Sequence, residues 1–183
     1  MAGRSPDGKR KMNSPEFKVN YAVFETDWGW IGAAGSPVGL MTLSLPRAKS
    51  GDALMLLGEH AMKGCENVVL FQDLAKELRS YLAGKPVEFN DRLDLAEATR
   101  FQREVWTMTR QIPYGESRSY SWIASRLGNP GACRAVGQAL GQNPLPILIP
   151  CHRVLAASGA VGGFSGGLDI KKRLLQLEDI HFS

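Results

Sequence analysis

The sequence predicts an α/β (α+β) protein, in which a small N-terminal α/β domain precedes a mainly helical C-terminal domain with a helix-turn-helix. Between residues 21 and 45, apolar and polar residues alternate around glycines, which is typical of strands joined by tight turns. From Thr99 onward, apolar residues recur at helical spacing in short segments bounded by capping residues, glycine and proline. The 183 residues, 44% hydrophobic and 22% charged, suit a globular protein of one or two domains.

The first predicted domain spans residues 19–90. Its strands lie on either side of a turn at residues 35–37, and a helix over 53–62 and a short strand over 67–70 are expected to follow. A clearer helix ends at Gly84-Lys85-Pro86 and carries one apolar face, formed by Leu74, Leu78, Tyr81 and Leu82. Residues 1–18 read as a flexible basic tail, and the linker to the second domain is expected over 87–98.

The second predicted domain, residues 98–183, begins with a helix whose Thr99 and Gln102 form a capping box. This helix is expected to bury Phe101, Val105 and Met108. Ser119 is expected to cap the next short helix, and a Gly128-Asn129-Pro130 turn follows it. The helix after the turn carries an apolar stripe, made of Ala132, Ala135, Val136, Ala139 and Leu140. Two short helices with a tight glycine turn predict a helix-turn-helix, although most helical hairpins bind no nucleic acid.

Charge is distributed unevenly along the chain. Residues 99–183 hold ten Lys/Arg against five Asp/Glu, whereas residues 19–98 hold seven against eleven. A polyanion such as DNA would therefore bind the C-terminal half. No apolar run approaches the roughly 18 residues that cross a bilayer, and the first 18 residues lack the apolar core of a secretory signal. Three cysteines with neither a paired framework nor zinc spacing lead us to expect a reducing compartment, the cytoplasm or a eukaryotic nucleus.

The stretch from Asn143 to Val154 carries the candidate chemistry. Cys151 lies between a proline and a histidine, at the end of a predicted buried apolar strand. A buried cysteine is most often a structural one that packs as a small hydrophobic residue. His152 could instead accept the thiol proton and leave a nucleophilic thiolate. Neighbouring side chains of a strand point to opposite faces, so this contact would need a turn or a bridging water. The residues alone leave both interpretations open.

Three motifs together resemble one family. Pro150-Cys-His-Arg-Val154, Arg134-Ala-Val-Gly137 and Ser165-Gly-Gly167 are similar to motifs of the 6-O-alkylguanine-DNA alkyltransferases, also called methylated-DNA–protein-cysteine methyltransferases. The resemblance is dense from residue 101 to 178 and looser over the first domain. It implies a ribonuclease-H-like first domain and irreversible, single-turnover transfer of an alkyl group from guanine in DNA, and it leaves open whether 4-O-alkylthymine is also a substrate.

The resemblance implies the catalytic roles. Cys151 matches the alkyl acceptor, His152 the water-linked base, and Glu178 the acid that orients this histidine. Without the family, Glu178 would be read as a solvated charge at a helix end. Asn143 matches the asparagine that braces the turn between the recognition helix and the active-site strand. Tyr120 matches the tyrosine that meets the charge on the departing guanine.

The resemblance also implies the contacts to the base. The backbone N–H of Ser165 matches a second donor to the departing guanine. The carbonyls of Cys151 and Val154 match those that read the guanine amino group. Phe164 stands where many members have tyrosine, so the ring that walls the pocket is kept and the hydroxyl is lost.

For DNA, Arg134 matches an arginine finger that fills the space left by a flipped-out base. The resemblance assigns further DNA contacts to the residues around it, namely Ser121, Cys133, Ala135 and Gly137. Small side chains let this helix approach the minor groove closely, and the family uses that groove. Cys133 departs from the usual alanine, and we interpret it as a small spacer because no histidine lies beside it.

The resemblance implies a monomer that needs no cofactor and no metal, and whose partner is double-stranded DNA containing alkylated guanine. Three alternative functions fit the sequence less well. A non-catalytic sensor of alkylated DNA would lack the acceptor cysteine. A sequence-specific regulator would carry more base-reading side chains on its recognition helix. A cysteine hydrolase would use Cys151, His152 and Glu178, but nothing in the sequence indicates an acyl pocket.

Overall fold

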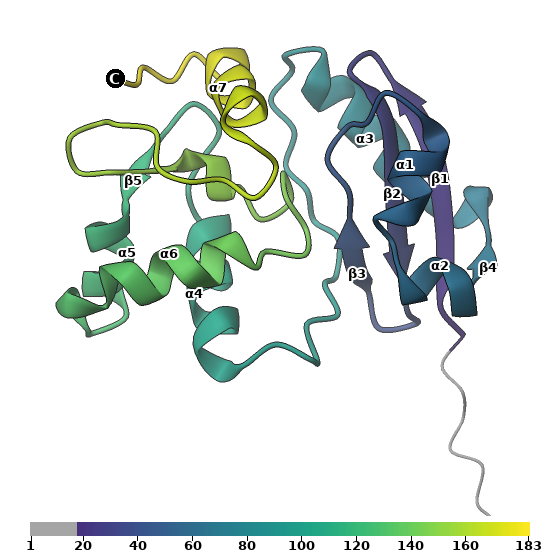
Figure 1. Cartoon of the computed structure of the whole chain (residues 1–183), viewed down its shortest axis with the longest axis horizontal. Helices are drawn as coiled ribbons and strands as arrows, with labels where there is room; N and C mark the ends of the chain where they lie inside the picture. Colours follow the sequence, from purple (N-terminus) through teal and green to yellow (C-terminus); the bar gives the residue numbers. More distant parts are fainter. Residues whose placement is uncertain (1–17) are drawn as a thin grey trace, which may run out of the picture.

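The computed structural model describes residues 18–183, and the predicted α+β class is confirmed. The N-terminal part is built on a four-stranded sheet of order β3-β2-β1-β4. The strands are β1 (Asn20–Thr26), β2 (Gly29–Gly35), β3 (Leu40–Leu43) and β4 (Cys65–Glu66). Neighbouring strands are antiparallel except β1 and β4, which run parallel. Figure 1 shows this sheet beside the helices of the C-terminal part.

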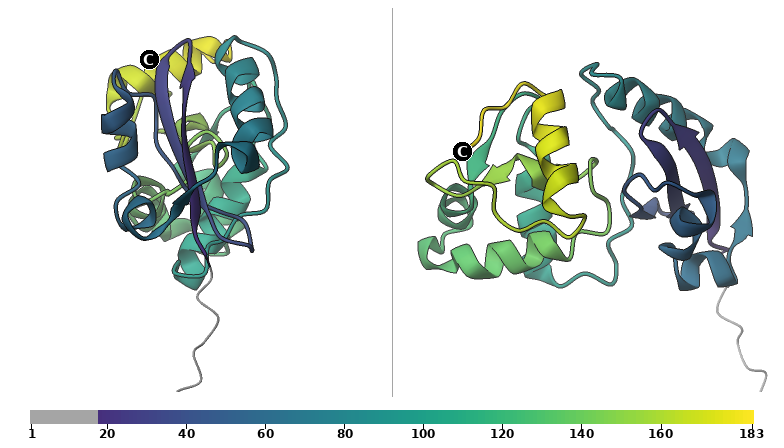
Figure 2. Two further views of the ribbon diagram at one scale, coloured as in Figure 1. Left: turned by 90° about the vertical axis from the view of Figure 1, so that its right-hand side faces the viewer. Right: turned by 45° about the horizontal axis from the view of Figure 1, so that its top comes forward.

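Helices cover both faces of the sheet. Helices α1 (Ser50–Met55) and α2 (Glu59–Lys63) lie on one side of the strands, and α3 (Gln72–Leu82) lies on the other (Figure 2). A 3₁₀ turn, η1 (Val68–Phe71), leads into α3. The predicted apolar face of α3 is confirmed, because all four of its expected residues are buried. This face anchors α3 in the core and determines where its last turn lies.

Two predicted elements of this part are wrong. The helix expected over 53–62 is divided into α1 and α2, because Gly58 adopts a positive φ of 53°, which a continuing helix does not allow. The strand expected over 67–70 is a 3₁₀ turn. The side chain of Asn67 accepts a hydrogen bond from the Leu70 N–H at 3.2 Å, and this local bond competes with strand pairing.

Helix α4 (Arg100–Arg110) opens the C-terminal part, and its predicted capping box is confirmed. The Thr99 hydroxyl accepts from the Gln102 N–H at 3.2 Å, and the Gln102 side chain accepts from the Thr99 N–H at 2.8 Å. Val105 is buried as expected, while Phe101 and Met108 are only half-buried. The cap therefore begins the helix where the sequence predicts it.

The helix-turn-helix consists of α5 (Tyr120–Arg126) and α6 (Cys133–Gly141), with the short 3₁₀ turn η2 (Pro130–Ala132) between them. The Ser119 hydroxyl caps α5 as predicted, accepting from the Trp122 N–H at 3.1 Å. Within the apolar stripe of α6, the three residues from the middle onward are buried, and the first two are half-buried. The N-terminal end of α6 is thus more open than its C-terminal end.

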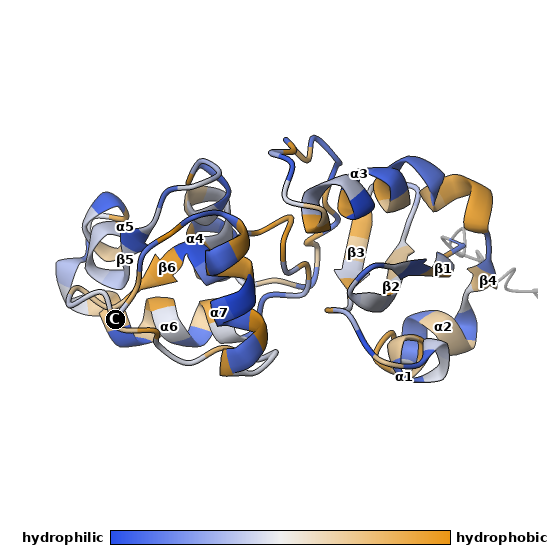
Figure 3. Cartoon of the chain, turned by 90° about the horizontal axis from the view of Figure 1, so that it is seen from above, coloured by the Kyte–Doolittle hydropathy of each residue, from blue (hydrophilic) through white to orange (hydrophobic). Residues whose placement is uncertain are grey.

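The remaining elements surround the helix-turn-helix. Strand β5 (Arg118–Ser119) pairs in parallel with β6 (Val154–Leu155). A 3₁₀ turn, η3 (Cys151–Arg153), comes directly before β6, and α7 (Leu168–Leu177) is the last helix of the chain. Figure 3 shows β6 as a hydrophobic strand with α4, α6 and α7 around it. The segment that holds the candidate cysteine therefore enters the interior of this part.

The two parts share one core. Buried apolar residues of the sheet and of α3 join those of α4, α5, α6 and α7 in a single cluster. Residues 87–98 run along β3, where the Leu40 N–H donates to the Arg92 carbonyl at 2.8 Å and the Asp94 N–H donates to the Leu40 carbonyl at 2.7 Å. The division into domains at 19–90 and 98–183 stays a prediction. The predicted basic tail lies outside the described residues except for Lys18.

Candidate active site

Cys151 follows a compact turn instead of the predicted apolar strand. Ile147 takes a positive φ of 76°, so residues 143–150 fold back on themselves. Asn143 braces this turn: its side-chain oxygen accepts from the Leu145 N–H at 2.9 Å, and its amide donates to the Ile149 carbonyl at 2.8 Å. The strand prediction is wrong because one asparagine side chain satisfies the backbone groups that a neighbouring strand would otherwise pair.

The thiol of Cys151 lies at the end of this turn. It is 5% exposed, whereas Cys65 is exposed and Cys133 is half-buried. The Asn143 amide also donates to Cys151 Sγ at 3.1 Å. Burial raises the pKa of the Cys151 thiol, while the Asn143 hydrogen bond and the charge of Lys171 act in the opposite direction. A thiol in this setting is protonated near neutral pH and needs a base to become a nucleophile.

His152, the residue after Cys151, forms a buried pair with Glu178. Glu178 caps the C-terminal end of α7 and is 2% exposed, so it is not the solvated charge that its place in the sequence suggests. His152 Nε2 lies 2.8 Å from Glu178 Oε1. Since an ionised carboxylate only accepts hydrogen bonds, Nε2 is the donor and Nδ1 keeps its lone pair. Nδ1 is buried and has no hydrogen-bond partner within residues 18–183.

Several donors hold Glu178. Arg153 Nε donates to Oε2 at 2.8 Å and Arg153 Nη2 to Oε1 at 3.0 Å, and the Gly115 N–H donates to Oε2 at 3.2 Å. Burial by itself raises the pKa of Glu178, but the hydrogen bonds from His152 and Arg153 outweigh it and lower the pKa to about 2. Burial also lowers the pKa of His152. The pair at neutral pH is therefore a carboxylate and a neutral imidazole.

Three buried polar residues at this site were missed by sequence reasoning. Tyr81 donates to Glu178 Oε1, Arg153 binds the same carboxylate, and Lys171 Nζ donates to the Val154 carbonyl at 2.8 Å. A signal for Lys171 was present: Lys171, Leu174, Leu175 and Glu178 follow an i, i+3, i+4, i+7 pattern. That spacing puts both charged residues on the buried face of α7.

An open groove of about 670 Å³ lies between α6 and the segment before α7. It is lined by Tyr120, Cys133, Arg134, Gly137, Gln138, Gly141, Gly162, Gly163, Phe164 and Ser165. The Tyr120 ring is half-buried there, and a Cβ on Gly162 would stand 2.6 Å from its hydroxyl oxygen. Burial raises the pKa of Tyr120, and the nearby Cys151 raises it further. The hydroxyl therefore stays protonated and can donate a hydrogen bond.

The other candidate residues differ in their exposure. Arg134 and Ser165 are exposed on its lining, and Ala135 is half-buried on α6. Ser121 is exposed, with its hydroxyl 2.8 Å from that of Ser119. Val154 is buried, and its carbonyl already accepts from Lys171. A carbonyl has two lone pairs, so this bond leaves one for a second donor.

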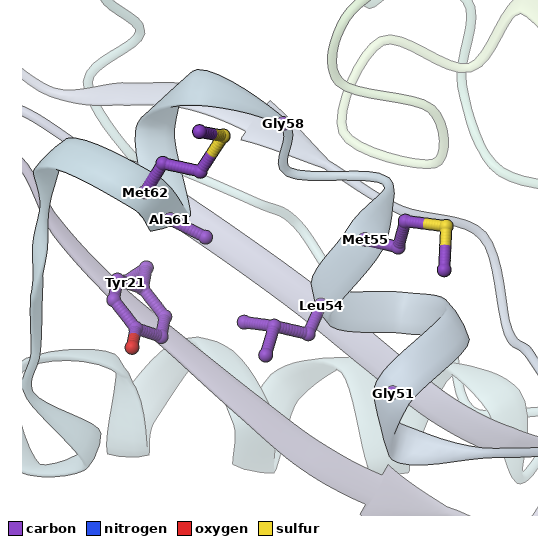
Figure 4. Close-up of a pocket in the computed structure, with 7 residues that line it drawn as sticks. All are labelled: Tyr21, Gly51, Leu54, Met55, Gly58, Ala61 and Met62. Atoms are coloured by element: carbon purple, nitrogen blue, oxygen red, sulfur yellow. The ribbon is translucent and has the colours of Figure 1, made fainter.

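A second pocket, in the N-terminal part, offers no comparable chemistry. It is lined by Tyr21, Gly51, Leu54, Met55, Gly58, Ala61 and Met62. Figure 4 shows the Leu54 side chain extending toward the Tyr21 ring. Within residues 18–183, no three His, Cys, Asp or Glu side chains gather as metal ligands do, and no helix is both long and apolar enough to cross a bilayer.

Comparison with known proteins identifies the relatives of this chain. Residues 100–180 match the family model described as 6-O-methylguanine DNA methyltransferase, DNA binding domain. The methylated-DNA–protein-cysteine methyltransferase of Methanosarcina acetivorans is 41% identical over 158 residues, which cover 86% of this chain and 97% of that protein. The protein of the same name from Mycolicibacterium paratuberculosis is 45% identical over 152 residues, or 80% of this chain and 90% of that one.

Solved structures agree with these relatives. The crystal structure of Mycobacterium tuberculosis OGT in complex with DNA has a TM-score of 0.74 and 38% identity, and it covers 87% of this chain and 92% of that one. The Mycobacterium tuberculosis 6-O-methylguanine methyltransferase matches with a TM-score of 0.73 over the same shares. The likeness extends over both parts of the fold, including the sheet where the sequence motifs are weakest. This chain belongs to the methylated-DNA–protein-cysteine methyltransferase family.

Proposed function

We propose that this chain repairs DNA directly, by moving the alkyl group of 6-O-alkylguanine to Cys151 Sγ in a single, irreversible turnover. The observation that carries this proposal is the buried thiol itself. It is held by Asn143 at 3.1 Å, lies next in sequence to a buried histidine–carboxylate pair, and lies near the tyrosine of an open groove. This arrangement suits a thiol that reacts once with a delivered electrophile.

The transfer balances without a cofactor. Cys151 Sγ attacks the alkyl carbon, the carbon–sulfur bond forms, and the bond from that carbon to the 6-oxygen of guanine breaks with its electron pair on the base. The Cys151 thiol loses a proton to the site, and the departing guanine takes up one proton from the site. The products are unmodified guanine and a thioether, which no group at the site can cleave, so each molecule acts once.

His152 is the base in this scheme. Its Nδ1 lone pair is buried and free to accept a proton from Cys151 through a bridging water, and the Nε2–H bond to Glu178 stabilises the imidazolium that forms. The raised pKa of the thiol and the lowered pKa of the imidazole mean that both groups rest uncharged. In this scheme the proton moves from Cys151 to His152 after the substrate has bound.

The departing guanine meets donors from two segments. The Tyr120 hydroxyl and the Ser165 backbone N–H stabilise the negative charge on the base, and Phe164 walls the pocket with its ring. The carbonyls of Cys151 and Val154 accept from the guanine amino group. Lys171 Nζ also donates to the Val154 carbonyl and holds it in position.

Double-stranded DNA containing the alkylated base is the proposed partner, bound by one copy of the chain. Arg134 is exposed near the start of α6 and fills the stack after the base has flipped out. The neighbouring residues on α6 have small side chains, namely Cys133, Ala135 and Gly137, so the backbone of this helix can come close to the minor groove. Ser121 on α5 supplies a further contact to the DNA backbone.

Mass spectrometry tests the proposal. The full chain is incubated with excess duplex carrying one 6-O-methylguanine, and the protein mass and the base composition of the DNA are followed together. We expect each protein to gain one methyl group in place of the thiol hydrogen, and an equal amount of guanine to be restored, after which the reaction stops. Unmodified duplex is the control. Methanol release with many turnovers would instead identify a hydrolase, and an unchanged protein mass would reject alkyl transfer.

A further inference from the structure

Tyr81 brings a hydroxyl from the N-terminal part of the chain into the candidate active site. It lies in the last turn of α3, the helix that packs on the sheet, and its side chain is fully buried. Its ring makes edge contacts with Phe89 and Tyr114, at centroid distances of 5.8 and 6.1 Å. Figure 1 shows the end of α3 approaching the side of the molecule where α7 lies.

The Tyr81 hydroxyl meets both members of the buried pair. It donates to Glu178 Oε1, and its oxygen lies 3.2 Å from His152 Nε2. Burial, followed by the charge of Glu178, raises the pKa of Tyr81 well above its ordinary value. The phenol therefore stays protonated at neutral pH. Its one proton goes to the carboxylate, so its lone pairs face Nε2 and can only accept from it.

This geometry favours one tautomer of His152. Two acceptors, Glu178 Oε1 at 2.8 Å and the Tyr81 oxygen at 3.2 Å, surround Nε2, so Nε2 carries the proton and Nδ1 keeps its lone pair. The charged groups around the ring are Glu178, which favours the imidazolium, and Arg153 and Lys171, which disfavour it. Tyr81 adds no charge. Its contribution is to orient the Glu178 carboxylate and the His152 ring, because its hydrogen bonds limit how both can rotate.

We propose that Tyr81 is a positioning residue for alkyl transfer, which acts through Glu178 to hold His152 with Nδ1 ready to accept the Cys151 proton. This inference rests on the proposed function. It gives the N-terminal part of the chain a role in the chemistry as well as in support, because its last helix completes the hydrogen bonding of the base.

The chain offers a matched control. Tyr114 lies against Tyr81, but its hydroxyl donates to the Leu177 carbonyl at 3.0 Å and does not reach the carboxylate. Tyr81→Phe and Tyr114→Phe therefore each remove one hydroxyl from the same aromatic cluster. Only the first removes a donor to Glu178.

Single-turnover kinetics with methylated duplex provide the first test. We expect Tyr81→Phe to lower the transfer rate at saturating DNA about tenfold, the scale of one hydrogen bond to a charged group, with the Kd for DNA unchanged. Tyr114→Phe should stay within about twofold of wild type on the same measurement. In a Glu178→Gln background, Tyr81→Phe should cause no further loss, because the carboxylate through which it acts is gone. Equal rates for Tyr81→Phe and wild type, or losses that simply multiply in the double variant, would overturn the proposal.

Nitrogen NMR of the wild-type chain provides a second test, which does not depend on the folding of Tyr81→Phe. The chain has three histidines, so the ring nitrogens of His152 can be assigned with a His152→Ala spectrum. Wild type should show a protonated Nε2, an unprotonated Nδ1, and a slowly exchanging Tyr81 hydroxyl proton close to the His152 ring. A protonated Nδ1, or a Tyr81 hydroxyl remote from the ring, would refute the role even if Tyr81→Phe does not fold. Wild type that gains no methyl group would contradict the proposed function instead and leave this geometry standing.

Discussion

Glu178→Gln tests the energetics of the buried site. In the folded chain the pKa of this carboxyl is about 2, against 4.5 for an ordinary glutamate. A depression of this size corresponds to about 3 kcal/mol of stability at neutral pH. The substitution also leaves the guanidinium of Arg153, which is 8% exposed, without its carboxylate, and breaking a buried pair in this way typically costs about 3–5 kcal/mol. We therefore expect a loss of about 3 kcal/mol, or a Tm lower by roughly 6–12 °C.

The pH dependence of this loss has a definite sign. Because the folded pKa is depressed, the stabilisation is fully present above pH 4.5 and is lost as the pH falls toward 2. Wild type and Glu178→Gln should thus differ by a constant amount from pH 7 to 5, and the difference should shrink below pH 4.5. Urea unfolding of both proteins at several pH values measures it.

Glu116→Gln is the matched control for this experiment. Glu116 pairs with Arg118 at 2.5 Å, but its side chain is 47% exposed. Removing such an exposed pair should change the free energy of unfolding by less than about 1 kcal/mol, at every pH. If Glu178→Gln cost no more than this control, or if its effect did not shrink in acid, the account of Glu178 as a buried, hydrogen-bonded carboxylate would be wrong.

Two further predictions concern the base and the DNA. Because burial lowers the pKa of His152 below 6.5, the single-turnover rate of wild type should be flat from pH 6.5 to 8 and should fall only in more acidic buffer. The His152→Ala variant should be slower than wild type, and its rate should rise toward high pH as the Cys151 thiol itself ionises. A wild-type rate that rises tenfold per pH unit through pH 7 would exclude His152 as the base. If Arg134 fills the vacated stack, Arg134→Ala should slow transfer far more on duplex than on single-stranded DNA, and Arg134→Lys should restore only part of the rate, since lysine has no planar head. Equal losses on the two substrates, measured by single-turnover kinetics, would point to a phosphate contact.

The sequence predicted those features that depend on local chemistry. The capping box at Thr99 and the hydroxyl cap at Ser119 appear as expected, because a cap needs only a side chain and the next turn of backbone. The wrong predictions concern apolar segments in which a single residue changes the course of the backbone. Gly58 divides the expected helix, and Asn143 folds the expected strand into a turn. In both regions apolar content alone does not distinguish a strand or helix from an irregular buried segment.

The site was predictable only in part. The sequence shows that Cys151 and His152 are neighbours, but only the resemblance connected Glu178 to them. The spacing of Lys171 and Glu178 on the apolar face of α7 would have indicated that both are buried. Tyr81 could not be linked to the site in this way, because its face of α3 looks like any other core face. The contact of its hydroxyl with Glu178 depends on how α3 and α7, which are far apart in the sequence, are placed in the fold.

The identity of the alkyl-accepting atom tests the account most directly. The full chain, a Cys65→Ser/Cys133→Ser variant and a Cys151→Ser variant are each incubated with duplex carrying one 6-O-methylguanine, and the methyl group is located by peptide mass spectrometry. We predict one methyl group on the peptide that holds Cys151 in the first two proteins. In Cys151→Ser we predict no methyl group, because a serine hydroxyl is far less ionised than a thiol. That variant should still bind the duplex. A methyl group on Cys65 or Cys133, or transfer by Cys151→Ser at a rate near wild type, would contradict the account.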